Sequence, residues 1–108
     1  MVDTEVYEAL LAASAAGRPV ALATVVRTRG SVPRHAGSKM LIDPVHGLVG
    51  TIGGGCGEAD VLEAARQALN DGSARLVQVE LTDAITSFSP AVCGGIMEVF
   101  VEPIRPHA

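Results

Sequence analysis

Both cysteines of this chain stand beside glycines, and these two places are where its sequence most directly suggests chemistry. Cys56 closes a run of three glycines, Gly53, Gly54 and Gly55. Consecutive glycines can turn several backbone N–H groups toward one point, and the helical pattern that follows adds the free N–H groups of a helix N-terminus. The segment therefore predicts a site for a phosphate or another oxyanion. The same surroundings stabilise a thiolate, so Cys56 is a candidate reactive thiol or soft-metal ligand.

The glycine run also has a purely structural interpretation, in which it permits a tight turn beside a neighbouring strand and Cys56 is a small buried side chain. The run does not match the dinucleotide-binding fingerprint, because Glu58 would occupy the third glycine position, and it lacks the lysine of a P-loop. Glu58 would either cap the following helix or act as a general base. Its place in the first helical turn favours capping.

Cys93 begins a second segment of this kind, because Gly94 and Gly95 follow it directly. Either the fold brings Cys93 to the same sheet edge as Cys56, or it is an inert cysteine in a glycine-rich bulge. Neither cysteine has a second ligand at the short spacing of structural zinc sites, so we do not expect zinc.

Basic residues gather on both sides of a turn at Gly30. They form either a solvated loop or a cluster that grips a small anion through its guanidinium groups. The members of this cluster are Arg27, Arg29, Arg34 and Lys39. The hydroxyl-rich segment 82–89 has no convincing His and Asp setting, so serine-type catalysis has little support.

Charge and composition narrow the class of partner. Eight Lys and Arg against twelve Asp and Glu give a net charge of −4, which is the wrong sign for a protein that neutralises duplex phosphates. With no Trp, one Tyr and two Phe, the chain has little aromatic surface on which bases could stack, so we expect no nucleic-acid partner. Its apolar stretches are too short to cross a bilayer and its N-terminus is acidic, which favours a cytoplasmic protein without a membrane partner. Two thiols in a reducing compartment agree with this.

The hydrophobic pattern indicates the elements that must hold these residues. An N-terminal helix capped by Asp3 precedes a buried strand over residues 20–26, and a hairpin and a second helix follow. The remaining ranges are 39–43 and 48–52 for the hairpin, 58–69 for the helix, and 75–81 and 96–102 for two further strands. We predict one small α/β (α+β) domain spanning residues 1–108, with a mixed sheet of about five strands and two main helices.

Three motifs resemble those of one known family when they are taken in order. They are Ala-Thr-Val-Val-Arg-Thr-Arg-Gly-Ser-Val-Pro-Arg at residues 23–34, Gly-Thr-Ile-Gly-Gly-Gly-Cys at 50–56, and Cys-Gly-Gly at 93–95 followed by Glu-Val-Phe-Val-Glu-Pro at 98–103. The chain resembles the XdhC/CoxI family of maturation factors for xanthine dehydrogenase and carbon monoxide dehydrogenase, from about residue 20 to residue 103. Many relatives carry a larger apolar residue at the position of Gly57, and full-length members usually continue into a Rossmann-like domain. This chain stops at Ala108, so we expect the single-domain type or one half of a split pair.

The resemblance implies a chaperone that binds molybdenum cofactor, a molybdopterin, transiently. It would protect the cofactor during sulfuration and deliver it to an apo molybdenum hydroxylase. Implied partners are that hydroxylase, a cysteine desulfurase, a separate Rossmann-like chain and a second copy of the protein. Cys56 would contact the molybdenum or its sulfur, Gly53, Gly54 and Gly55 would supply amides, Arg34 would hold an anionic group of the pterin, and Cys93 with Gly94 would line the same pocket. The alternative is a thiol-based redox or sulfur-transfer enzyme that uses Cys56 and Cys93.

Overall fold

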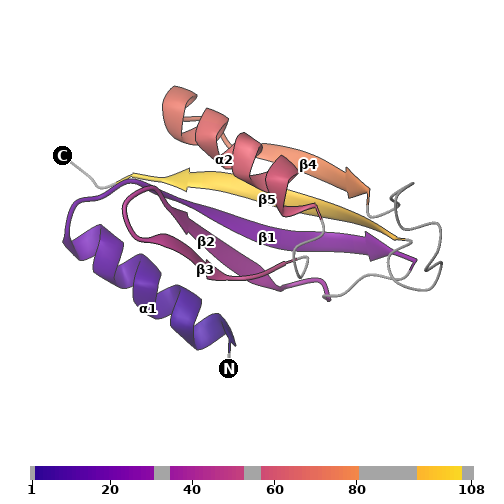
Figure 1. The fold of residues 1–108 in the computed structure, drawn as a ribbon, viewed down its shortest axis with the longest axis horizontal. Coiled ribbons are helices and arrows are strands. Elements are labelled where there is room, and N and C mark those ends of the chain that lie inside the picture. The colour runs from indigo at the N-terminus through magenta and orange to yellow at the C-terminus, as the bar shows by residue number, and fades with distance from the viewer. Residues whose placement is uncertain (1, 31–34, 53–56, 81–94, 106–108) are drawn as a thin grey trace.

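The computed structural model of the chain describes residues 2–30, 35–52, 57–80 and 95–105. These residues form two helices and five strands in the predicted order (Figure 1). The helices are α1 (Val2–Ala15) and α2 (Glu58–Asp71), and the strands are β1 (Val20–Arg29), β2 (Lys39–Asp43), β3 (Gly47–Gly50), β4 (Arg75–Glu80) and β5 (Ile96–Ile104). The predicted α/β fold class is confirmed, and each predicted element exists within a few residues of its expected bounds.

The apolar run that begins at Val20 forms the central strand of the sheet. The strand order is β3-β2-β1-β5-β4, so β1 has a neighbour on each side. Its first half is buried on both faces, which is why this half lacks the polar and apolar alternation of a half-exposed strand. β1 therefore anchors both neighbouring strands.

The sheet differs from the expected mixed sheet in the direction of its strands. Every neighbouring pair in it is antiparallel. The helix between β3 and β4 does join two strands that run the same way, which is the arrangement that a strand-helix-strand pattern predicts. These two strands, however, lie at opposite edges of the sheet, with three antiparallel strands between them. The crossover therefore produces no parallel pair.

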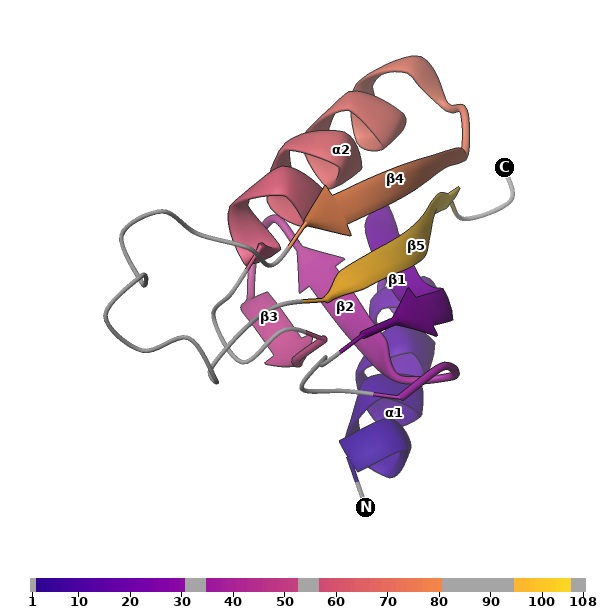
Figure 2. The same ribbon diagram turned by 90° about the vertical axis from the view of Figure 1, so that its right-hand side faces the viewer.

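The two helices cover opposite faces of the sheet (Figure 2). Ala21, Ala23 and Val25 of β1 belong to the core beneath α2, whereas Val20 and Leu22 belong to the core beneath α1. This division follows from the period of two along a strand. α2 packs on β1, β4 and β5, while α1 packs on β2 and β3. The face on the side of α1 is therefore covered over β2 and β3, whereas over β4 and β5 no described helix covers it.

Glycines in left-handed conformation bound the second helix. Gly57 is the N-cap of α2 with φ 74°, and Gly72 is its C-cap with φ 78° and donates its N–H to the carbonyl of Ala68. These are conformations that glycine adopts without the penalty of a Cβ atom. α1 already includes Val2, so Asp3 lies in its first turn and is not the cap that the sequence suggests.

A β-bulge interrupts β1 in its second half. Val25 pairs with Val99 and Arg27 with Glu98 of β5, so Val26 is the extra residue. A bulge of this kind shifts which side chains face each side of the sheet. Beyond it, Arg27 and Arg29 lie on the face away from α2, with Glu98 and Ile96 opposite them.

Neither described helix has the length and apolar character that crossing a membrane requires.

Candidate functional site

The residues that the sequence singled out for cofactor binding fall in three segments outside the described residues. They are Arg34 in the first segment, Gly53, Gly54, Gly55 and Cys56 in the second, and Cys93 and Gly94 in the third. Their roles, and the closeness of Cys56 to Cys93, stay predictions. The structure does describe the residues on either side of each segment.

These flanking residues lie toward the same end of the sheet, at the right of Figure 1. Arg29 at the end of β1 and Glu80 at the end of β4 both pair with Ile96 at the start of β5. β3 ends at Gly50, which pairs with Met40 near the start of β2, on this same side of the sheet. The chain therefore leaves or enters the sheet for all three motif segments at one end, which we call the motif end.

A side-chain hydrogen bond joins the two sides of the glycine and cysteine segment. The hydroxyl of Thr51 donates to the carboxylate of Glu58, in the first turn of α2. The bond ties the exit from β3 to the start of the helix, so it limits how far apart the two sides of the segment 53–56 can move. Glu58 therefore contacts a side chain on the other side of the glycine segment, and its capping role stays a prediction. Thr51 was not identified from the sequence as a positioning residue. The feature that could have indicated it is a hydroxyl on one side of the glycines and a carboxylate on the other.

The N-terminus of α2 has one feature that favours anion binding and one that opposes it. Its N-cap is Gly57, which makes no side-chain hydrogen bond to the first turn. The N–H of Asp60 donates to the Gly57 carbonyl, and the N–H groups at the start of a helix in general favour an anionic acceptor. Glu58 and Asp60, however, already place two carboxylates there, and these complement the helix dipole themselves. Any anion bound at this terminus would need further cationic contacts.

The predicted basic cluster is only partly brought together. Arg27, Arg29 and Lys39 lie on the face of the sheet opposite α2, as the registers of β1 and β2 show. Arg27 lies 3.8 Å from the carboxylate of Glu98. The three residues therefore lie on the face opposite the core beneath α2, and the anion-binding role predicted for the cluster stays a prediction.

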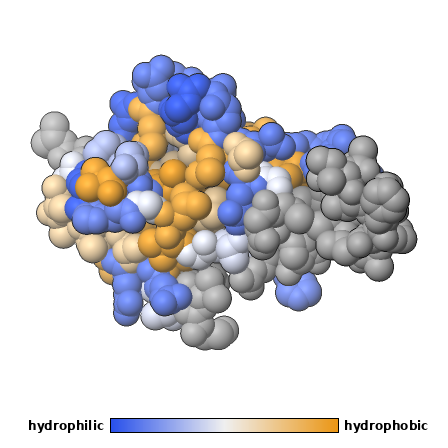
Figure 3. Space-filling view, viewed as in Figure 1, coloured by the Kyte–Doolittle hydropathy of each residue, from blue (hydrophilic) through white to orange (hydrophobic). Residues whose placement is uncertain are grey.

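A cavity of about 430 Å³ lies between α2 and the β2 end of the hairpin, away from the motif segments. Its lining is Ile42, Pro44, Leu62, Arg66, Leu69 and Asn70. The apolar surface in the middle of Figure 3, below α2, includes this region. Because Leu69 and Asn70 are in the last turns of α2 and Glu58 is in its first, the cavity lies at the far end of the helix from the motif segments. It is not the predicted cofactor site.

The described residues contain no group of three or more His, Cys, Asp or Glu side chains that could hold a metal ion.

Comparisons with known proteins show what this chain is similar to in sequence and fold. The chain is 40% identical over 91 residues to YqeB, an uncharacterized protein of Escherichia coli K12, over 82% of this chain and 17% of YqeB. Its fold is similar to that of a Bacillus halodurans protein described as a xanthine dehydrogenase, with a TM-score of 0.74 and 28% identity, over 95% of this chain and 30% of that one. The chain thus spans less than a third of either relative. The model of the XdhC and CoxI family matches residues 13–80, which include the first two motif segments. The chain belongs to the XdhC and CoxI family.

Proposed function

We propose that this protein is a maturation factor that binds molybdenum cofactor, assists its sulfuration and helps insert it into an apo molybdenum hydroxylase. Family membership supports the general role, and one structural observation supports the location of the site. The ends of the described segments that border Arg34, Cys56 and Cys93 all lie toward the motif end of the sheet. Residues from three separate parts of the sequence can therefore contribute to one site.

The described part of the motif end partly fits such a cofactor. A molybdopterin carries a phosphate, and the glycine N-cap of α2 leaves the backbone N–H groups of the first turn without a side-chain partner from that cap. When bound, the cofactor would supply a molybdenum centre with soft sulfur ligands. The chain's own contribution would be to hold the anionic part through backbone amides and Arg34, with Cys56 as the thiolate at the metal or sulfur end.

The alternative function is a thiol-based redox or sulfur-transfer enzyme. The observation that favours it is the same convergence, since segments carrying both cysteines start from one end of the sheet. In that case sulfur would be carried on a cysteine as a persulfide, and cofactor retention would not be needed. The experiment below separates the two.

The test is to produce the full 108-residue chain in cells that make molybdopterin and to measure the pterin that it retains. Wild-type protein should co-purify with molybdopterin, and Cys56→Ser and Arg34→Ala should retain less. Charge-assisted hydrogen bonds contribute about 1.5–3 kcal/mol, so Arg34→Ala should weaken affinity for isolated molybdopterin roughly ten- to a hundredfold. Arg34→Lys should also bind less tightly, because an ammonium cannot reproduce bidentate guanidinium contacts.

Arg66→Lys is a matched control, because Arg66 is exposed on α2 and pairs with Glu63. It should bind as wild type does. Equal retention in wild type, Cys56→Ser and Arg34→Ala would contradict the proposed site. A persulfide on Cys56 or Cys93 after treatment with a cysteine desulfurase and cysteine, without any retained pterin, would favour the enzyme instead.

A further inference from the structure

One half of the sheet has a face that neither described helix covers, and this face combines apolar and charged side chains. The face is formed by the second half of β1 together with β5 and β4, on the side away from α2. Leu76 is 58% exposed and Phe100 36%, although both belong to strands. α1 packs on β2 and β3 and does not shield these side chains. We call this surface the open face.

The strand registers arrange the open face in rows. Arg29, Ile96 and Glu80 form the first row, at the motif end, and Thr24, Phe100 and Leu76 form the third. In the row between them, Arg27, Glu98 and Gln78 are aligned. Each row thus has a β1 residue on one side, a β5 residue in the middle and a β4 residue on the other side.

The charges on this face are divided between its two sides. Arg27 and Arg29 lie on β1, while Glu80 lies on β4, with the apolar side chain of Ile96 between Arg29 and Glu80. A surface that is basic on one side and acidic on the other is complementary to itself after rotation about a central two-fold axis.

We propose that the open face binds the open face of a second copy of this chain. With the two-fold axis running along β5, between the two sheets, the β1 side of one copy covers the β4 side of the other. Arg29 of each copy then meets Glu80 of its partner, and the two Phe100 side chains meet near the axis. The sheets would pack face to face at the usual separation of about 10 Å.

Two carboxylates of β5, Glu98 and Glu102, fall close to the axis, each opposite its own counterpart. Glu102 pairs with Leu22, one row beyond Phe100 and outside the rows that β4 completes, so it lies at the end of the contact. Glu98 lies within the contact and is paired inside each copy. Arg27 of the same copy lies 3.8 Å from the Glu98 carboxylate, and the Glu98 side chain is 21% exposed. The pair can therefore approach its symmetry mate without two uncompensated carboxylates.

The size of the face predicts a weak dimer. β4 has six residues, and three strands about 4.8 Å apart with a rise of about 3.4 Å per residue cover roughly 14 by 20 Å. A face of this size is below the small end of specific protein interfaces, so we expect weak association that needs micromolar or higher concentrations. The proposal is independent of the function proposed above, because it requires no residue of the motif segments.

The test is sedimentation velocity of the full chain from about 5 to 500 µM, the range in which so small an interface should begin to form. Wild-type protein should shift from monomer to dimer. Arg29→Glu alone and Glu80→Arg alone should each stay monomeric, because like charges then meet at both symmetry-related contacts. An equimolar mixture of Arg29→Glu and Glu80→Arg should form a heterodimer, since both contacts become ion pairs again. This rescue by mixing arises only from contacts between copies.

Phe100→Glu should abolish association both in the homodimer and in the mixture, because it places charges at the apolar centre. Arg66→Glu, on the outer surface of α2, is the control and should leave association unchanged. Circular dichroism and thermal unfolding show whether each variant is folded. A wild-type protein that stays monomeric throughout the range would overturn the proposal, as would a dimer that none of the open-face substitutions weakens.

Discussion

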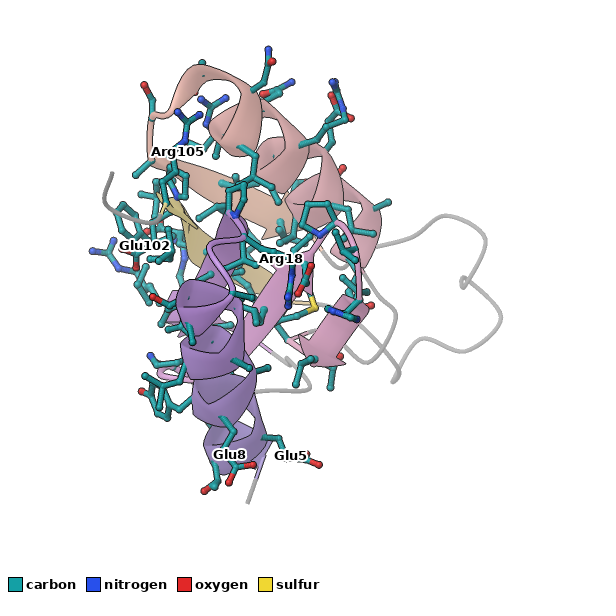
Figure 4. The ribbon with its side chains drawn as sticks, turned by 90° about the vertical axis from the view of Figure 1, so that its left-hand side faces the viewer. Glu5, Glu8, Arg18, Glu102 and Arg105 are labelled. Carbon is teal, nitrogen blue, oxygen red and sulfur yellow. The ribbon has the colours of Figure 1, made fainter. Side chains whose placement is uncertain are left out.

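The two ends of the sheet are held together in different ways. At the end of the β2–β3 turn, the Arg18 guanidinium donates to the Asp43 carboxylate at 2.9 Å, and this contact joins the α1–β1 connection to the hairpin (Figure 4). The other Asp43 oxygen accepts the backbone N–H groups of Val45 and His46 at 2.8 and 3.2 Å. At the same end, Arg105 donates to the carbonyl of Leu69 in the last turn of α2. We call this the hairpin end.

The motif end has a different character. The described chain leaves the sheet there after β1, β3 and β4 and re-enters it there at β2 and β5. Across one of these exits, the side chains of Thr51 and Glu58 form a hydrogen bond. The described residues that border the candidate cofactor segments lie at this end. The hairpin end is held by several side-chain contacts between distant elements, whereas the described part of the motif end borders the segments proposed to bind.

Removing the central carboxylate of the hairpin end should have the largest effect on stability. Asp43→Ala leaves the guanidinium of Arg18, whose side chain is only 25% exposed, without its partner and two backbone N–H groups without an acceptor. Breaking one side of a buried pair costs about 3–5 kcal/mol, and the exposure of Arg18 places the expected loss near the lower limit, at about 3 kcal/mol. Urea unfolding measures it. Asp43→Asn keeps an acceptor oxygen for the amides and should lose less; an equal loss in both variants would assign the effect to the charge alone.

Substituting the two glycines at the ends of β3 compares the packing at the two ends of the sheet. Gly50, at the motif end, has φ +83°, and a Cβ atom there would lie 2.8 Å from the Lys39 carbonyl oxygen and 2.9 Å from Val6. Gly47, at the hairpin end, has φ +93° with nothing within 4 Å. Both Ala variants carry the backbone penalty of about 1 kcal/mol, and Gly50→Ala adds an overpacking cost of about 1–2 kcal/mol. Thermal unfolding should show the larger loss for Gly50→Ala, and equal losses would mean that Val6 and β2 adjust freely.

The Asp43 carboxylate should make the free energy of unfolding depend on pH in the acid range. Burial by itself raises the pKa of Asp43, but the hydrogen bonds from Arg18, Val45 and His46 together with the Arg18 charge outweigh it and lower the pKa to about 2. The pKa of Asp43 in the folded protein is below its ordinary value of 3.8. The stability that the charged carboxylate contributes is therefore present above about pH 4 and is lost as the pH falls toward 2. The loss should be on the order of 2 kcal/mol.

The measurement for that prediction is the stability difference between wild type and Asp43→Asn as a function of pH. Taking the difference removes the titration of the other carboxylates. It should shrink steadily from pH 4 to pH 2. A constant difference across that range would show that the Asp43 carboxylate is not held in its charged form.

The smallest effect is expected at the motif end. Thr51→Val keeps the side-chain shape and removes the hydroxyl that bonds Glu58, which should cost about 1 kcal/mol because the contact is only partly buried. Thr51 makes a further interaction, so the bond is isolated by a double-mutant cycle with Glu58→Gln. A coupling close to zero would mean that Thr51 and Glu58 do not hold the two sides of the glycine segment together.

Much of this protein follows from the local sequence. The apolar run after Val20, the alternation in the strands at 75–81 and 96–102, and the glycines beside α2 were enough to predict the elements and their order. Local patterns carry this information because each depends on residues a few positions apart, through the periods of helix and strand and the left-handed conformations of glycine. The family resemblance of the motifs is likewise a property of the linear chain.

Tertiary structure alone decided how the elements are combined. The antiparallel direction of every neighbouring pair, the bulge at Val26 and the contact between Arg18 and Asp43 depend on residues far apart in the chain, and no local period encodes them. The local sequence also does not show that Arg27, Arg29 and Lys39 lie on the face away from α2. The one-residue bulge in β1 and the register of the strands decide on which face these side chains lie. The sequence by itself predicted candidate binding residues in three segments that contain or follow glycines. Only the pairing of the five strands brought the borders of those segments to one end of the sheet, because strand pairing joins residues that are distant in sequence.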